Sequence, residues 1–225
     1  MMKMIRVSMT ALALLLLSHT GPLVAGGNPG AGTQPAETPA KAATLPVDVS
    51  KSTMQWTAKK VTGQHNGTVK LAGGTLQVKG NKLTGGTFSM DMTTITVSDI
   101  TDASGNAKLT GHLKSEDFFS VEKHPASTFT LTKAAPIAGA KAGEPNYTLT
   151  GNLTIKGITN PVTFPATVKI SGNAAEATAR LDVDRTKWDI KYRAAIIGTV
   201  ADKVIEDNFT IDLKIVAGKS ETASR

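Results

Sequence analysis

The stretch GHLKSEDFFSVEKHP, residues 111–125, is the densest group of ionisable side chains in the chain. His112 and Glu116 lie four positions apart, so on a helix both would reach one metal ion, with His124 as a third ligand. The stretch has no HExxH pattern and the chain has no cysteine. Because helical His–Glu pairs are usually surface contacts, we expect no metal here.

Two enzymatic interpretations of the same stretch are also weak. Glu116 and Asp117 are adjacent, so on a helix they point in different directions and do not form a cooperating carboxylate pair. Ser115 near His112 would supply a nucleophile and a base, but no G-x-S-x-G elbow surrounds it, and a helix cap explains the serine better. We expect no catalytic residue and no cofactor. A lipid or small-ester hydrolase that uses His112 stays open as an alternative.

Most of the remaining chain alternates between apolar and polar residues. The longest run is Tyr147, Leu149, Gly151, Leu153 and Ile155. A period of two indicates strands with one buried face. The connections are short and rich in Gly, Asn or Pro, which predicts antiparallel hairpins with turns at 63–67, 71–74, 80–83, 156–161 and 171–174. Many such strands form either a sandwich or an up-and-down barrel.

The alternation fails between residues 98 and 124. Leu109 and Leu113 lie one helical turn apart there, which predicts one short helix between strands. Phe118 and Phe119 follow it and are expected to point inward. The helix, with His112 and Leu113, is expected to cover the barrel and to gate access to its interior.

The ends of the chain have other compositions. Residues 1–25 combine two cations, a short apolar run and small residues, which is the pattern of a signal peptide. Residues 26–46 predict a disordered linker rich in Gly, Pro, Ala and Thr, and residues 218–225 a disordered tail. One domain remains, residues 47–217. We therefore expect an exported protein, either periplasmic or secreted.

Composition excludes several classes of function. Without cysteine the chain has no disulfide and no thiol chemistry. Its formal net charge of +7 includes no block of consecutive Lys and Arg, so nucleic-acid binding is not expected. One cluster, which includes Arg185 and Trp188, is both basic and aromatic. At a barrel rim it would suit a transient contact with a membrane surface.

Two longer segments carry a resemblance. LTGHLKSEDFFSVEKHPASTFTLT, residues 109–132, and YTLTGNLTIKGITNPVTFPATV, residues 147–168, closely resemble the YceI-like family of exported lipid-binding proteins. The resemblance covers about residues 47–216. It implies a lipocalin-like, eight-stranded antiparallel β-barrel, all-β apart from the short helix, whose interior holds a long isoprenoid or fatty chain.

An eight-stranded barrel either fills with side chains or holds one slender ligand. The small residues Gly151, Ala166, Ala177 and Ala179 on inward faces leave space, which fits a packed core as well as a cavity, and the resemblance favours the cavity. We therefore predict a protein that binds, sequesters or transports an isoprenoid or fatty-chain lipid without covalent chemistry. A protein-binding barrel with a packed core is the second alternative, and both a monomer and a homodimer stay open.

The expected ligand-binding residues come from the inward faces of the strands, from the helix and the residues after it, and from the basic and aromatic cluster. They are Trp56, Phe88, Met90, His112, Leu113, Phe118, Phe119, Phe129, Leu149, Leu153, Phe164, Arg185, Trp188, Phe209 and Ile211. This prediction depends on strand register, because a slip of one residue exchanges the two faces of a strand.

Overall fold

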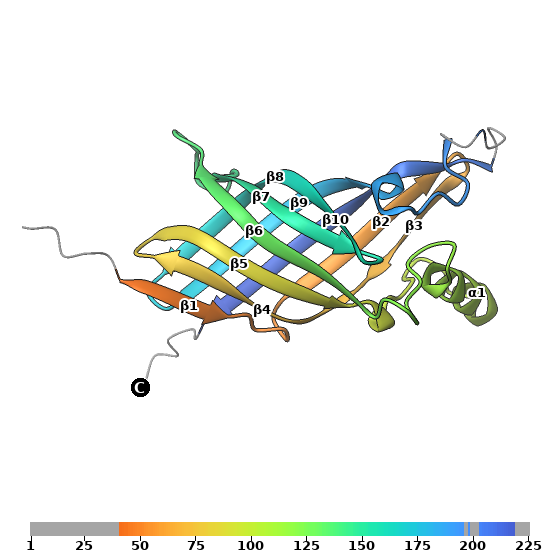
Figure 1. Cartoon of the computed structure of the whole chain (residues 1–225), viewed down its shortest axis with the longest axis horizontal. Coiled ribbons are helices and arrows are strands. Elements are labelled where there is room, and N and C mark those ends of the chain that lie inside the picture. The colour runs from red at the N-terminus through yellow and green to blue at the C-terminus, as the bar shows by residue number, and fades with distance from the viewer. Residues whose placement is uncertain (1–40, 196–197, 199–202, 219–225) are drawn as a thin grey trace, which may run out of the picture. The chain divides into compact units, whose positions relative to one another are not determined.

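The computed structural model describes residues 41–195, 198 and 203–218. This part of the chain contains ten strands, one α-helix and two short 3-10 helices (Figure 1). In chain order they are β1 (Ala42–Pro46), β2 (Thr53–Lys60), β3 (Gly63–Thr68), β4 (Lys70–Lys79), β5 (Lys82–Asp91), η1 (Met92–Thr94), α1 (Ala103–Lys114), β6 (Ala126–Pro136), β7 (Tyr147–Ile155), β8 (Ile158–Ser171), β9 (Ala174–Asp184), η2 (Arg185–Trp188) and β10 (Ile205–Gly218).

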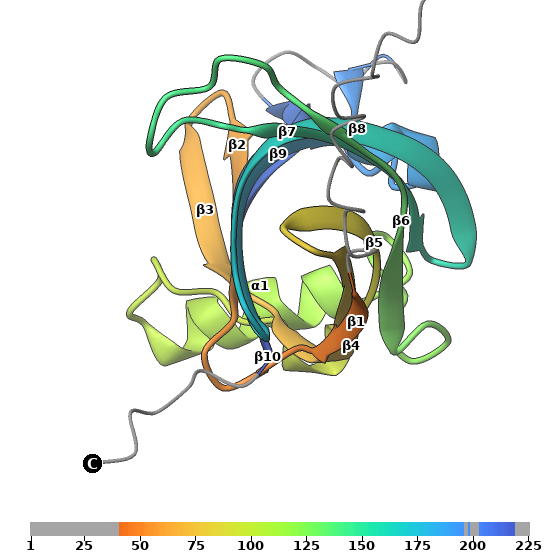
Figure 2. The ribbon, with the colours of Figure 1, turned by 90° about the vertical axis from the view of Figure 1, so that its left-hand side faces the viewer.

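All these strands belong to one antiparallel sheet in the order β1-β4-β5-β6-β7-β8-β9-β10-β2-β3. The sheet curls around an interior (Figure 2), and Val47 next to β1 forms an isolated bridge with Ala217 of β10. The all-β, barrel-like fold class is confirmed. The predicted number of eight strands is too low, because β1 and β3, with 5 and 6 residues, extend the two edges beyond the eight longer strands.

Strand β1 lies where the sequence predicts the end of a disordered linker. It pairs with β4, and Leu45 lies opposite Leu76 with only 4% of its surface exposed. With a single large apolar residue, the segment shows no alternation of apolar and polar residues in the sequence. The strand is therefore recognised only from its pairing in the structure. Residues 26–40 of the predicted linker, the predicted signal peptide and residues 219–225 of the predicted tail lie outside the described residues.

Two glycine-containing segments that the sequence predicts as turns lie within strands instead. GQHNG is part of β3, and the turn precedes it at residues 61–62. A Cβ on Gly67 would lie 1.8 Å from the carbonyl oxygen of Thr96, so this glycine permits a close approach of two backbones. LAGG lies inside β4, where the register shifts after Leu71, as at a β-bulge.

The predicted alternation is confirmed most clearly in β7. Tyr147, Leu149, Gly151, Leu153 and Ile155 are all buried, and none of the residues between them is. The buried face of each strand turns toward the interior of the curled sheet. The interior therefore receives the apolar side chains that the period of two selects.

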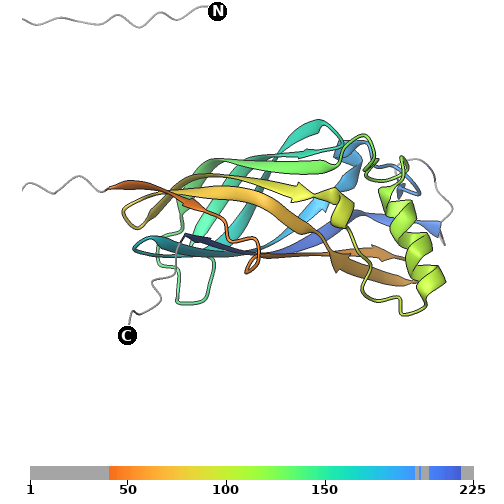
Figure 3. The ribbon, with the colours of Figure 1, turned by 90° about the horizontal axis from the view of Figure 1, so that it is seen from below.

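The predicted helix is α1, and it lies at the same end of the barrel as the β2–β3 hairpin (Figures 1 and 3). It begins where the carboxylate of Asp102 accepts a hydrogen bond from the backbone N–H of Gly105 at 2.7 Å. Leu113 is the one residue that the helix buries. No helix in the described ranges is long and apolar enough to cross a membrane.

Candidate functional site

Two apolar chambers adjoin inside the curled sheet. Chamber 1, on the side of α1, holds about 820 Å³ of space free of atoms including its opening, and chamber 2 holds about 780 Å³. Packed aromatic rings make both chambers narrow, because 6.4 Å separates the ring centroids of Phe119 and Phe209 in chamber 1 and 5.8 Å those of Phe129 and Phe164 in chamber 2. Met54, Met90, Leu153 and Ile211 line both chambers. We call these four residues the waist.

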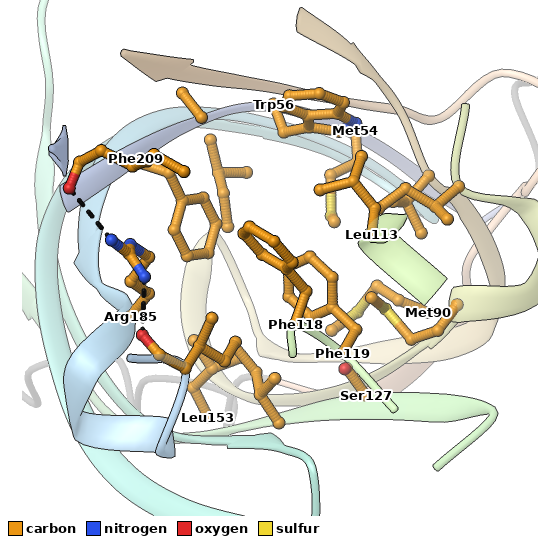
Figure 4. Close-up of a pocket in the computed structure, with 18 of the residues that line it drawn as sticks. Met54, Trp56, Met90, Leu113, Phe118, Phe119, Ser127, Leu153, Arg185 and Phe209 are labelled. Atoms are coloured by element: carbon orange, nitrogen blue, oxygen red, sulfur yellow. Dashed lines mark hydrogen bonds between the residues drawn. The ribbon is translucent and has the colours of Figure 1, made fainter. Parts of the chain in front are cut away.

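Chamber 1 contains the two neighbouring phenylalanines of the segment after α1. Figure 4 shows the rings of Phe118 and Phe119 pointing into the chamber, between Phe209 and Leu113. Phe119 packs edge to face against Phe209 with 6.4 Å between ring centroids. The predicted ligand-binding residues that line this chamber are Trp56, Met90, Leu113, Phe118, Phe119, Leu153, Arg185, Phe209 and Ile211.

Chamber 2 is lined mainly by large aliphatic residues, together with three phenylalanines and three alanines. Ala166, Ala177 and Ala179 line it, as expected for residues that leave space. Gly151 differs, because a Cβ there would lie 2.3 Å from Cζ of Phe129, so the Phe129 ring occupies the space that the glycine leaves. The predicted residues that line chamber 2 are Phe88, Met90, Phe129, Leu149, Leu153, Phe164 and Ile211.

The structure places His112 outside both chambers. Its Nε2 lies 3.0 Å from Oδ2 of Asp117. Its ring packs edge to face against Phe118 and Tyr192, with centroid distances of 4.9 and 4.6 Å. The side chain of Leu113 points into the interior. The side chain of His112 points away from it, because adjacent residues on a helix point in different directions. His112 therefore supports the wall of chamber 1 without lining it.

Trp188 also lines neither chamber. Only 1% of its surface is exposed, and its Nε1 donates a hydrogen bond to the carbonyl oxygen of Leu153 at 3.1 Å. An aromatic residue in a basic segment suggests a position at a solvent-exposed barrel rim. This indole is instead buried and its N–H has a hydrogen-bond acceptor, as expected of a tryptophan in a protein core.

Arg185 lines chamber 1 but is buried, with 4% of its surface exposed. Its guanidinium donates hydrogen bonds of 2.8–3.1 Å to the carbonyl oxygens of Ile190, Tyr192, Ile205 and Glu206. Figure 4 shows Arg185 at the edge of the chamber with some of these bonds as dashed lines. Burial lowers its pKa, and the negative charge of nearby aspartates opposes that effect. Arg185 and Trp188 therefore lie inside the protein and not at a barrel rim, and the transient membrane contact stays a prediction.

The residues that would carry catalysis or hold a metal are committed to other contacts. Ser115 Oγ donates to the backbone carbonyl oxygen of His112 at 2.8 Å, as a helix-ending contact. Glu116 pairs with Lys123, and this ion pair holds the pKa of Glu116 below its usual value. The described residues contain no group of three histidine or acidic side chains placed to hold a metal ion.

Several lining residues are absent from the predicted set. Leu131, Leu213 and Ile215 line chamber 2 and belong to the same alternating runs as the predicted residues. Extending the prediction along those runs would have included them. Ile95 and Ile190 line chamber 1 from segments that follow the two 3-10 helices, where no period of two exists to reveal them.

Fold and cavity together define a lipocalin-like β-barrel protein. The family model described as YceI-like domain matches residues 46–217, so the chain belongs to the YceI-like family.

Curated relatives are UPF0312 proteins. One from Pectobacterium carotovorum subsp. carotovorum is 33% identical over 125 residues, which is 56% of this chain and 55% of that protein. One from Pseudomonas paraeruginosa is 35% identical over 125 residues, 56% of each chain. The chain spans about half the length of the curated relatives it matches.

Two solved structures share the fold. BcnA from Burkholderia cenocepacia has a TM-score of 0.58 and 23% identity, with 76% of this chain and 99% of that chain covered. A polyisoprenoid binding domain from Saccharophagus degradans, implicated in plant cell wall breakdown, has a TM-score of 0.53 and 11% identity. That comparison covers 80% of this chain and 100% of the domain. At these identities the likeness shows the fold alone.

Proposed function

We propose that the protein binds one long apolar chain, an isoprenoid or a fatty chain, in the two adjoining chambers. The observation that carries this proposal is the chemistry of the walls. The surface exposed inside both chambers is almost entirely apolar, and the two chambers adjoin at the four waist residues that line both. A narrow apolar space of this form suits a slender hydrocarbon better than a compact polar molecule.

The energetics favour a hydrocarbon over water in this space. An ordered internal water needs two to four polar partners, and these walls offer almost none. Each CH₂ group that leaves water for the chambers stabilises the complex by about 0.8 kcal/mol before the entropy cost of binding. Affinity should therefore rise with chain length until both chambers are filled.

The comparisons support the isoprenoid as the first ligand class to test. The Saccharophagus degradans domain with the same fold is described as polyisoprenoid binding. The hydrogen bond from Ser115 Oγ to the backbone carbonyl oxygen of His112 supports binding without covalent chemistry. The leader-like composition of residues 1–25 supports export to the periplasm or beyond the cell.

Native mass spectrometry of the exported protein, followed by organic extraction, tests the proposal. We expect a bound prenyl or acyl lipid, or uptake of a prenyl alcohol by the lipid-free protein. An Ile211→Glu variant places a carboxylate at the waist and should lose the ligand, whereas Asp212→Glu, on the outer face of the same strand, should retain it. A protein that neither carries nor takes up lipid contradicts the proposal. Ester turnover abolished by His112→Ala would favour the hydrolase.

A further inference from the structure

The tip of the β2–β3 hairpin is exposed, apolar and positively charged. Val61 has 67% of its surface exposed, the largest value among the large hydrophobic residues of the described ranges. Lys59 and Lys60 precede it and are also exposed. Two further exposed cations, Arg193 and Lys203, come from the segment between η2 and β10. We call these five residues the cationic tip.

Backbone pairing brings the two parts of the cationic tip together. Lys60 lies opposite Ile205 in the register between β2 and β10. On its other side, Ile205 donates a backbone hydrogen bond to the carbonyl oxygen of Arg193 at 3.0 Å. Ile205 itself lines chamber 1. The cationic tip therefore borders the chamber 1 end of the barrel.

Among the described residues, the cations at this end are not paired with carboxylates. No acidic residue occurs in the sequence between Asp48 and Asp91, a stretch that contains the whole β2–β3 hairpin. Within the described ranges, Lys59, Lys60, Arg193 and Lys203 take part in no ion pair, whereas Lys191 is paired with Asp189. Among the described residues, the exposed carboxylate nearest in the chain is Glu206, beside Ile205, and in the sequence Asp202 precedes Lys203. The guanidinium of Arg193 lies over the ring of Tyr192, 5.2 Å from its centroid. The tip thus combines four exposed cations, none of them in an ion pair with a described residue, with an exposed aliphatic side chain.

We propose that the cationic tip docks the chamber 1 end of the barrel on an anionic phospholipid membrane. Val61 enters the interfacial region, and the four cations lie against lipid phosphates. A membrane fits better than a nucleic acid or an acidic protein, because an aliphatic side chain beside lysines is the pattern that interfacial binding uses. The inference rests on the proposed function, since a membrane is where a long-chain lipid resides.

Vesicle co-sedimentation of the full chain tests the docking. Vesicles of phosphatidylcholine alone are compared with vesicles of equal parts phosphatidylcholine and phosphatidylglycerol. We expect binding to the anionic vesicles only, weakened by salt. Charge reversal by Lys59→Glu with Lys60→Glu should lower vesicle affinity roughly tenfold or more. The matched control is Lys79→Glu with Lys82→Glu, at the β4–β5 turn on the opposite end of the barrel, and it should retain affinity within about twofold.

Insertion of the tip is measured separately by fluorescence. A Val61→Trp variant should shift its emission to the blue on anionic vesicles, whereas Asn81→Trp at the β4–β5 turn should not. Equal loss of binding in both charge-reversed variants would overturn the docking site, because it would show a nonspecific effect of net charge. Absence of binding by the unmodified protein would overturn it as well.

Uptake of a prenyl alcohol from dilute solution, without vesicles, distinguishes this inference from the proposed function. The variant with Lys59→Glu and Lys60→Glu should keep uptake while it loses vesicle binding. Uptake without vesicle binding by the unmodified protein would refute docking and leave the lipid-binding function standing. Vesicle binding without uptake would support the docking surface and refute the lipid-binding function.

Discussion

Trp188 donates its indole hydrogen bond to the carbonyl oxygen of Leu153, which joins η2 to strand β7. Leu153 belongs to the waist, so a residue that touches no chamber holds one of the residues shared by both. This contact makes Trp188 a structural residue of the cavity wall rather than a ligand-binding one.

The first prediction follows from this contact. Trp188→Phe leaves a buried carbonyl oxygen without its donor, so the free energy of unfolding should fall by about 1–3 kcal/mol. Urea denaturation measures the loss. Trp56→Phe is the matched variant, because Trp56 Nε1 donates to the carbonyl oxygen of Thr96 at a partly buried site and its ring lines chamber 1. Trp56→Phe should lower the free energy of unfolding less than Trp188→Phe does, and it should change lipid uptake more. The opposite result would contradict the structural role of Trp188 and the ligand-binding role of Trp56.

Arg185 is the second position to test. Arg185→Met leaves four carbonyl oxygens without a donor and should lower the free energy of unfolding by about 3–5 kcal/mol. Arg185→Lys keeps the charge but cannot reach four acceptors, so it should be destabilising as well. If the lysine variant were as stable as the unmodified protein, the 3.7 Å ion pair with Asp207 would be the more important contact.

Asp99 gives a prediction about pH. Burial alone would raise its pKa, but hydrogen bonds from the backbone N–H of Asn66 and from His65 outweigh burial and hold the pKa below 3.8. The ionised carboxylate therefore stabilises the fold above that pH, and this contribution disappears as the pH falls through the folded-state value.

Asp99→Asn should accordingly lower the free energy of unfolding by about 1 kcal/mol at neutral pH. In strong acid the difference from the unmodified protein should become smaller. Denaturant unfolding at several pH values measures both. Glu122→Gln, at an exposed position, is the control and should have little effect at any pH. A loss of stability that is the same at neutral and acid pH would show that the carboxylate charge is irrelevant.

Chamber 2 gives a prediction about ligand length. Ala177→Phe places a ring in chamber 2 and should weaken binding of long chains roughly tenfold or more, while chains short enough for chamber 1 bind as before. A series of prenyl alcohols measured by fluorescence competition checks this. Thr163→Phe, on the exposed face of β8, should bind the whole series normally. Equal weakening for short and long chains would mean that the chambers do not act in series.

The sequence predicts the strands well wherever the period of two is long, because side-chain alternation is a local property. β7 shows this. The nine strand residues that were expected to point inward include Leu149 and Phe209, which do line the cavity. β1 was missed because Leu45 is its single large apolar residue. Arg185 was misjudged because its four acceptors belong to distant or irregular backbone, which no local pattern reveals.

Two members of the waist, Met54 and Met90, carry thioether sulfur in a chain that has no thiol. An oxidant that reaches the interior would therefore act on methionine, and oxidation to the sulfoxide converts a flexible apolar side chain into a polar one. The change would fall where the two chambers meet. A sulfoxide there should weaken the binding of chains long enough to occupy both chambers, and enzymatic reduction of the sulfoxide should restore that binding.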